Sequence, residues 1–211
     1  MYIPKHFEEN RTDVLHALIR AFPLGSLVTL GSSGLLVNHI PFLVDSGAGP
    51  LGTLRGHVAR ANPVWKEFAS EVESVAIFRG PESYISPSWY PSKLKDGKVV
   101  PTWNYVVVHA YGIPRVIEDP AWLHQHVSDL SQTHEAGRAE PWQVGDAPDD
   151  YIQKMLGAIV GLEIPVTRLL GKSKLSQNRS EEDRRGVISG LDASGDADSL
   201  AMAELLKGGQ S

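Results

Sequence analysis

The sequence predicts an α+β protein, mainly β, in which a small antiparallel barrel carries helices at its ends. Most of the predicted strands follow one another with short links, whereas a parallel βαβ sheet would alternate strands with helices. The 211 residues include 20 glycines and 14 prolines, a share that favours many turns. Hydrophobic residues make up 42% and charged residues 21%, which is close to the balance of globular proteins and excludes general disorder.

The first part of the chain predicts a helix followed by three strands. Apolar residues recur at three- and four-residue spacing between Asn10, a good N-cap, and Pro23, which predicts an amphipathic helix. Residues 26–30 and 35–44 are rich in β-forming side chains, and the short Gly-Ser-Ser-Gly connection between them indicates a hairpin. A third strand is expected at 52–58.

The middle of the chain predicts a short helix, a strand, a loop and a long strand. Asn62 is a suitable cap, and the proline after it suits the first position of a helix of about two turns. A strand is expected at 74–78. Segment 80–93 is rich in glycine and proline and is therefore expected to be a loop. Residues 102–117 are expected to form the longest strand.

The last part of the chain is predicted to be mainly helical, with one closing strand. Asp119 and Pro120 are a second cap-and-proline start, and apolar spacing then predicts a helix to about Glu135. We also expect a short helix at 151–159, a closing strand at 161–175 and helices within 176–191 and 196–208.

Charge, cysteine count and missing motifs exclude several classes of protein. The formal net charge of −5 gives the chain no overall basic field that would hold nucleic acid non-specifically. The absence of cysteine excludes disulfides, thiol catalysis and thiolate metal sites. No segment reads as a signal peptide or a membrane span, so we expect a soluble, cytoplasmic protein. The Walker, dinucleotide, HExxH and GxSxG motifs are also missing.

Histidine spacing predicts no metal site. His124 and His126 form an HxH pair, but on a helix the two side chains point roughly 200° apart and cannot share one metal ion. The acidic run at 181–183 fits the first turn of a helix, where carboxylates favour the helix dipole. Both features are therefore interpreted as structural.

Three cationic or imidazole side chains surround the end of the third predicted strand. Arg55, His57 and Arg60 precede the predicted helix start at Asn62. Cationic donors beside free backbone N–H groups are what a phosphate needs. A surface strand that carries two arginines would give the same pattern, and the spacing alone favours neither interpretation.

Aromatic and hydroxyl residues cluster in the predicted loop and at the start of the long strand. Flat apolar faces beside small polar groups would hold a planar heterocycle and bond to its edges. The same composition suits a dimer interface, and both interpretations hold if the ligand lies between subunits. The cluster comprises Tyr84, Ser86, Ser88, Trp89, Tyr90, Trp103, Asn104 and Tyr105.

A locally basic run follows the closing strand. Residues 168–185 carry more positive than negative side chains, although the whole chain is acidic. The run, with Lys172, Lys174 and Arg179, could neutralise a phosphate, contact DNA or form a solvated helix face, the last being the commonest case.

Six blocks of the sequence follow in order over residues 1–191: MYIPKHF, NHIPF, GHVARANPVW, FRGPESYISPSWY, VPTWNYVVVHAYG and KLSQNRSEEDRRGVISGL. Together they resemble the PaiB-type family of FMN-binding negative transcriptional regulators. One departure is His134, where the family pattern has a tyrosine before Glu135. Residues 192–211 lie outside the resemblance and are predicted to be a variable tail with room for a short helix.

This resemblance implies the FMN-binding split barrel, a six-stranded antiparallel Greek-key barrel that usually forms a homodimer with flavin sites between subunits. Residues 1–191 would form that domain. The implied phosphate ligands are Arg55, His57, Arg60 and Asn62. The isoalloxazine would lie near Asn38, His39, Ser86, Ser88, Trp89, Trp103 and Asn104.

The function implied is that of an FMN-binding homodimer that represses transcription, directly on promoter DNA or through a partner. An FMN-dependent oxidoreductase of small molecules is the alternative, although the sequence identifies no residue as the acid or base for that chemistry. Haem binding is a third interpretation, in which the candidate ligands are His39, His57 and His109. A histidine in such a position is more often a hydrogen-bonded structural residue.

Overall fold

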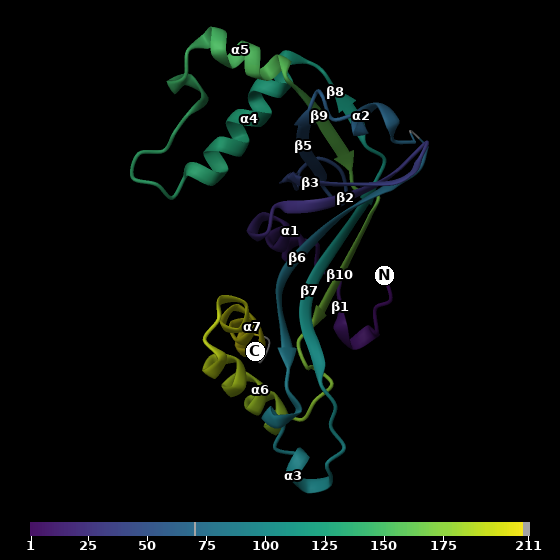
Figure 1. The fold of residues 1–211 in the computed structure, drawn as a ribbon, viewed down its shortest axis with the longest axis vertical. Helices are drawn as coiled ribbons and strands as arrows, with labels where there is room; N and C mark the ends of the chain where they lie inside the picture. The colour runs from purple at the N-terminus through teal and green to yellow at the C-terminus, as the bar shows by residue number, and fades with distance from the viewer. Residues whose placement is uncertain (70, 209–211) are drawn as a thin grey trace. The chain divides into compact units, whose positions relative to one another are not determined.

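The computed structural model describes residues 1–69 and 71–208, which form two compact units (Figure 1). The first unit combines Met1–Leu18, Arg79–Val108 and the described chain from Leu170 onward. The second unit combines Ile19–Phe78 with His109–Leu169. Each unit is therefore assembled from segments that are distant in the sequence.

The second unit contains two antiparallel sheet regions and the helices that cover them. Strands β2 and β3 form the predicted hairpin, in register from Leu24↔Pro41 to Gly31↔Gly34. Gly34 has φ +117, a conformation that a residue with a side chain rarely adopts, so a glycine is required after the turn. The unit's elements are β2 (Leu24–Gly31), β3 (Gly34–Pro41), β4 (Leu43–Asp45), β5 (Thr53–Ala59), α2 (Val64–Glu67), β8 (Arg115–Ile117), α4 (Pro120–Glu135), η3 (Val144–Asp146), α5 (Asp149–Gly157) and β9 (Ile159–Pro165).

The sheet β4-β5-β9-β8 supplies one wall of the second unit's core. Leu54 and Val58 of β5 lie opposite Ile164 and Val160 of β9, and all four side chains are buried. Between them, a Cβ on Gly56 would lie 3.0 Å from Phe42, so this glycine lets the aromatic ring pack against the strand. The other face of β5 is left for α4.

The first unit contains one sheet region, β1-β10-β7-β6, and two C-terminal helices. Helices α6 and α7, yellow in Figure 1, pack against each other. Their shared core buries Ile85, Tyr90, Val187, Leu191, Met202, Ala203 and Leu206. The elements assigned to this unit or continuing into it are η1 (Lys5–Phe7), β1 (Glu8–Glu9), α1 (Thr12–Ala21), β6 (Ser74–Ile85), η2 (Pro87–Trp89), α3 (Lys93–Asp96), β7 (Thr102–Gly112), β10 (Arg168–Lys174), α6 (Glu181–Ser194) and α7 (Ala197–Gly208).

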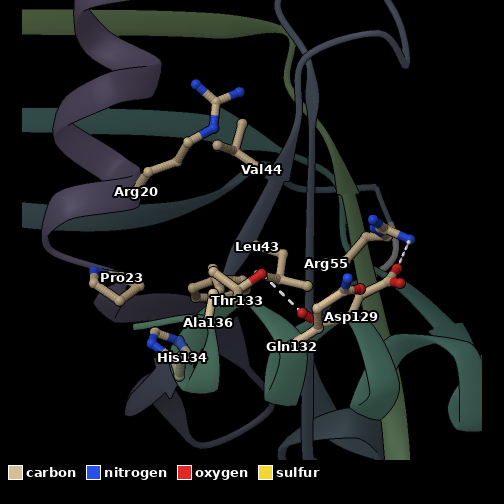
Figure 2. Close-up of a pocket in the computed structure, with 11 residues that line it drawn as sticks. Arg20, Pro23, Leu43, Val44, Arg55, Asp129, Gln132, Thr133, His134 and Ala136 are labelled. Atoms are coloured by element: carbon tan, nitrogen blue, oxygen red, sulfur yellow. Dashed lines mark hydrogen bonds and ion pairs between the residues drawn. The ribbon is translucent and has the colours of Figure 1, made fainter. Parts of the chain in front are cut away.

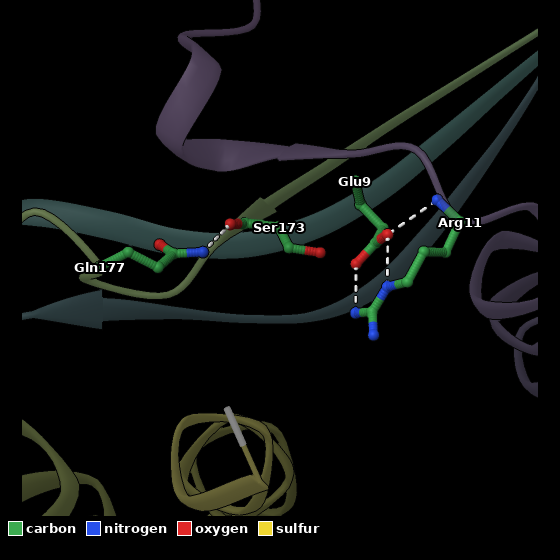
Figure 3. A network of polar contacts seen from close by, with 4 residues as sticks. All are labelled: Glu9, Arg11, Ser173 and Gln177. Atoms are coloured by element: carbon green, nitrogen blue, oxygen red, sulfur yellow. Dashed lines mark hydrogen bonds and ion pairs between the residues drawn. The ribbon is translucent and has the colours of Figure 1, made fainter. Parts of the chain in front are cut away.

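Strand β1 pairs with β10 through two residues, and a local ion pair follows β1 in the chain. Glu8 and Glu9 lie opposite Lys172 and Gly171. Arg11 then donates to both carboxylate oxygens of Glu9, from Nε at 3.0 Å and Nη2 at 2.7 Å (Figure 3). This fork lowers the pKa of Glu9 and fixes the chain just before α1.

The antiparallel α+β prediction is confirmed, but several predicted boundaries are wrong, and the predicted strand 35–44 divides into β3 and β4. Segment 80–93 is not all loop, because β6 continues to Ile85. The strand predicted at 102–117 is not the longest, because β6 is longer than β7. The predicted strand 102–117 divides into β7 and β8, and the predicted strand 161–175 divides into β9 and β10. A proline lies at or beside both breaks, where it cannot donate to a strand ladder.

Candidate functional site

Strand β5 presents Arg55 and His57 on one face, and helix α4 covers that face. Side chains alternate along a strand, so both point away from the core. Arg55 Nη1 lies 3.2 Å from Asp129 Oδ2. His57 Nδ1 lies 3.1 Å from His126 Nε2. Two of the predicted phosphate ligands therefore contact side chains of α4.

His126 is fully buried and is held between two aromatic neighbours. Its ring stacks on Trp122 with centroids 5.1 Å apart and planes 19° apart. Trp122 in turn fits over Gly161, where a Cβ would lie 2.4 Å from the indole. Burial, together with the positive charges of His57 and Arg55, lowers the pKa of His126 to about 4. Burial also lowers the pKa of His57, so both rings are neutral at pH 7.

A cavity of about 460 Å³ lies beside the C-terminal part of α4; we call it the arginine pocket (Figure 2). Arg55 enters it from β5, and Arg20 enters it from α1, where Arg20 Nη2 bonds Ser46 Oγ at 3.2 Å. The Nε–H of Arg55 is buried without an acceptor in the described part of the chain. The pocket is lined by Arg20, Pro23, Phe42, Leu43, Val44, Arg55, Asp129, Gln132, Thr133, His134 and Ala136.

Arg60 is already engaged by three protein acceptors. Its Nη1 bonds Glu118 Oε2 at 2.6 Å, while Nε and Nη2 bond the carbonyls of Gly157 and Ile159. The guanidinium fork therefore ties the end of β5 to the start of β9. Three of the five N–H groups of Arg60 are thus used within the protein, which leaves one on each terminal nitrogen for a further acceptor.

Asn38, His39 and Asn62 are predicted ligands on β3 and before α2, and each has a protein partner. Asn62 Nδ2 donates to Asn38 Oδ1 at 2.7 Å, and Asn62 Oδ1 accepts from the backbone N–H of Val64 at 3.0 Å. His39 is exposed, with Nδ1 3.1 Å from Ser26 Oγ. The structure therefore brings Asn38 and Asn62 together, and Asn62 also accepts a hydrogen bond from the first residue of α2.

The predicted ring contacts Ser86, Ser88 and Trp89 belong to the first unit. Ser86 caps η2 by accepting from the N–H of Ser88. Trp89 packs flat on α6, because a Cβ on Gly190 would lie 2.3 Å from the indole. Trp89 therefore contributes to the packing of this unit as well as to its surface.

Trp103 and Asn104 are adjacent on β7 and point to opposite sides of the strand. Trp103 is 53% exposed and meets Tyr84 edge to face, with centroids 6.1 Å apart. Asn104 is fully buried and donates to Ser176 Oγ at 3.0 Å. Of this pair, Trp103 alone is accessible to a ligand.

The cations Lys172, Lys174 and Arg179 come together in the first unit. Burial and the positive charges of the other two lower the pKa of Lys174, whose Nζ also bonds Thr102 Oγ1 at 2.5 Å. Lys172 is 9% exposed and bonds a backbone carbonyl, while Arg179 lies over the ring of Tyr90. Most of their donors thus face the protein.

The structure gives separate partners to the three histidines considered for haem. His39 bonds Ser26 and His57 bonds His126, whereas His109 Nδ1 lies 3.4 Å from the hydroxyl of Tyr111. Within residues 1–69 and 71–208, no group of three or more metal-binding side chains is assembled. Over the same ranges, none of the helices is both long and apolar enough to span a bilayer.

Comparison with known proteins decides the family. The model of the family described as "Putative FMN-binding domain" matches residues 1–168. The chain belongs to this family. The Bacillus subtilis protein named protease synthase and sporulation protein PAI 2 is 30% identical over 98% of this chain and 97% of its own, and an uncharacterised Emericella nidulans protein is 34% identical over 98% and 96%. The resemblance to the PaiB-type family is thereby confirmed.

Solved structures place this FMN-binding family member in the flavin-binding split-barrel fold. The flavocytochrome Anf3 of Azotobacter vinelandii superposes with a TM-score of 0.58, covering 87% of this chain and 78% of its own at 14% identity. The FAD and haem binding protein of Mycobacterium smegmatis superposes with a TM-score of 0.58, covering 90% of this chain and 80% of its own at 14% identity. At these identities the likeness establishes the fold alone.

The donors of the arginine pocket fit the phosphate of a flavin mononucleotide. Arg55 has an orphaned buried Nε–H, and Arg20 adds a second guanidinium. Guanidinium groups form charge-assisted hydrogen bonds with phosphate oxygens. Arg60 also carries a guanidinium, but three of its five N–H groups already donate to protein acceptors.

Sequence reasoning missed Arg20, Asp129 and Thr133, which line the arginine pocket with Arg55. Arg20 was visible only as a polar residue of the first helix. Asp129 and Thr133 are four residues apart in α4 and share one helix face, and Thr133 donates to the carbonyl of Asp129 at 2.7 Å. That helix face would predict these site residues only if the contact between α4 and β5 were already known.

Proposed function

We propose that the protein is an FMN-binding homodimer and a negative regulator of transcription. The match of residues 1–168 to the FMN-binding family model carries the flavin part of this proposal. The relative named for protease synthesis and sporulation supports the regulatory part. As a regulator, the protein would act in the cytoplasm.

Arg55 and Arg20 are the proposed anchors of the FMN phosphate. An acceptor on the ligand would satisfy the buried Nε–H of Arg55, whose other end is paired with Asp129. The amide pair Asn38–Asn62 and the exposed His39 remain proposed contacts in the same unit. The proposed ring contacts in the first unit remain Ser86, Ser88, Trp89, Trp103 and Asn104, with Asn104 acting through the packing of β7.

The phosphate anchor is tested by titrating the protein with FMN and with riboflavin, which lacks the phosphate. Arg55→Ala should weaken FMN about 10- to 100-fold, the size of a charge-assisted hydrogen bond, and leave riboflavin nearly unchanged. Arg115→Ala, which removes an exposed arginine elsewhere in the second unit, is the control. Equal loss of both flavins, or no loss of FMN, would move the phosphate site elsewhere.

The outer face of the β2–β3 hairpin supports the homodimer. Leu30 lies opposite Leu35, and Val28 lies opposite Val37, all on the face turned away from the core. Leu35 is 74% exposed and Val37 58%, and β3 is an edge strand. An apolar face on an open strand edge favours association with another chain.

Val37→Asp should convert the dimer to single chains in light-scattering measurements of mass, because it would bury a charge in the contact. Val116→Asp introduces the same charge on β8, at the edge of the other sheet, and should leave the mass unchanged. A wild-type protein that runs as single chains at every concentration would contradict the dimer.

The regulatory role is tested by the mobility of DNA upstream of the protein's own gene. We expect a retarded band that weakens with salt, as phosphate contacts require, and that responds to FMN. Substitution of Lys174 and Arg179 together by Ala tests the half-buried cation cluster as the contact. No retardation at low salt, with or without FMN, would refute direct DNA binding.

A further inference from the structure

A second cavity, of about 370 Å³, lies on a different face of α4 from the arginine pocket. Val127 and Ser131, four residues apart, face it, whereas Asp129 and Thr133 face the arginine pocket. We call it the histidine pocket. Its lining is His57, Val127, Ser131, Trp142, Val144, Tyr151, Ile152, Met155, Leu156 and Ile159.

The walls of the histidine pocket are mainly apolar and are open to water. Helix α5 contributes Tyr151, Met155 and two aliphatic side chains, and Trp142 closes the pocket from the loop before η3. Tyr151 is 53% exposed, Trp142 44% and Met155 38%. A ligand that covered these side chains would remove apolar surface from water, which is the usual driving force for small-molecule binding.

The lining contains no Asp, Glu, Lys or Arg side chain. A charged ligand would therefore lose its hydration without gaining an ion pair. The cavity thus selects against the charged groups that the arginine pocket favours.

The proton positions of the histidine pair determine what His57 offers to the pocket. A neutral imidazole carries one N–H and one acceptor nitrogen. His126 Nδ1 is buried without a partner in the described part of the chain. An unpaired buried N–H is rarer than an unpaired acceptor, so the proton of His126 belongs on Nε2, where it is donated to His57 Nδ1.

This assignment leaves the proton of His57 on Nε2. Within residues 1–69 and 71–208, Nε2 is the ring nitrogen of His57 that has no hydrogen-bond partner. The stack of His126 on Trp122, seated over Gly161, keeps the pair in this orientation. His57 therefore supplies a fixed imidazole donor to a mainly apolar pocket, whose lining also includes Ser131 and Tyr151. A few polar groups in an apolar cavity are the pattern of a specific ligand site.

We propose that the histidine pocket binds an uncharged, mainly apolar small molecule that places a hydrogen-bond acceptor, such as a ketone oxygen, against His57 Nε2–H. The ligand is distinct from the flavin and its site does not depend on the arginine pocket.

The test uses 6-propionyl-2-dimethylaminonaphthalene, an uncharged aromatic ketone whose emission shifts to the blue in apolar surroundings. We expect saturable binding with a blue shift, and at least tenfold weaker binding of 2-dimethylaminonaphthalene, which lacks the ketone. Met155→Lys, which places a charge in the wall, should weaken the ketone at least tenfold. Gln153→Lys adds the same charge on an exposed position of α5 outside the lining and should bind as the wild type.

Equal affinity for the two probes, or for the wild type and Met155→Lys, would overturn the proposal. A second readout is nitrogen-15 NMR of histidine-labelled protein, in which His57 should be protonated on Nε2 and its resonance should move when the ketone is added. Protonation of His57 on Nδ1 would also overturn it. The FMN titration of Met155→Lys should match the wild type, so failure of this site and failure of the flavin site give different results.

Discussion

The buried side chain of His126 is held by one partner that is distant in the sequence and by one that is close to it. Its ring contacts His57 of β5 and Trp122 one helical turn earlier. The positive charges of His57 and Arg55 oppose its protonation, and Asp129 favours it, but burial is the largest effect. His126 is therefore neutral in the folded protein at a pH where it is protonated in the unfolded chain.

The free energy of unfolding should fall as the pH falls from about 6.5 to about 4, because the unfolded chain binds a proton that folded His126 does not. This contribution to the free energy of unfolding is fully present above the pKa that His126 has in the unfolded chain. It is lost as the pH falls to the folded pKa, and the loss amounts to about 3 kcal/mol. Urea unfolding at intervals of pH measures it. His126→Phe, which keeps a ring on Trp122, should reduce the slope of the unfolding free energy against pH. Some of this slope should remain, because the pKa of His57 is lowered too. An unchanged slope would contradict this account.

The candidate site could be predicted only in part from single residues. The sequence drew attention to Arg55 and His57, but it could not reveal that Asp129 and His126 cover them. These partners are more than sixty positions away, and local spacing carries no information about such pairs. Arg60 is a predicted ligand that also ties the end of β5 to the start of β9, because a guanidinium bonds carbonyls and carboxylates as readily as phosphates.

At the scale of elements, helix signals in the sequence were reliable because they are local. Asp119 accepts from the N–H of Trp122 at 2.7 Å, as its position before Pro120 predicts. Strand β6 was predicted too short because Gly80 and the proline after it suggested a loop. Its buried positions change from even to odd numbers at Arg79–Gly80, so one extra residue shifts the alternation, as in a β-bulge, without ending the strand.

Helix α6 depends on two glycines that admit Trp89. A Cβ on Gly190 would lie 2.3 Å from the indole, and on Gly186 it would lie 2.0 Å from the carbonyl oxygen of Trp89. Gly190→Ala should therefore destabilise the protein by about 1–3 kcal/mol in urea unfolding, although alanine is the better helix former. Gly157→Ala, at the end of α5 with no atom near its Cβ, should be neutral or stabilising. Equal effects of the two changes would contradict the packing of Trp89.

At the scale of the whole molecule, four elements join the two units. α1, β6, β7 and β10 each begin in one unit and end in the other. This organisation could not be predicted, because the chain shows no change of composition or linker at the crossings. The predicted tail 192–211 lies beyond the family match, yet its described part contains α7, whose Met202, Ala203 and Leu206 are fully buried in the first unit.

The C-terminal helix should therefore be required for the stability of the first unit. Leu206→Ala removes a fully buried side chain from the core that α6 and α7 share, and should cost about 2–5 kcal/mol. Leu205→Ala removes the same atoms from a neighbouring side chain that is 38% exposed, and should cost less than about 1 kcal/mol. Urea unfolding measures the two costs, and amide hydrogen exchange locates the loss. Exchange should accelerate in α6, η2 and the adjoining part of β6. Equal costs for the two leucines, or unchanged exchange in α6, would mean that α7 is dispensable to this core and that the unit closes without it.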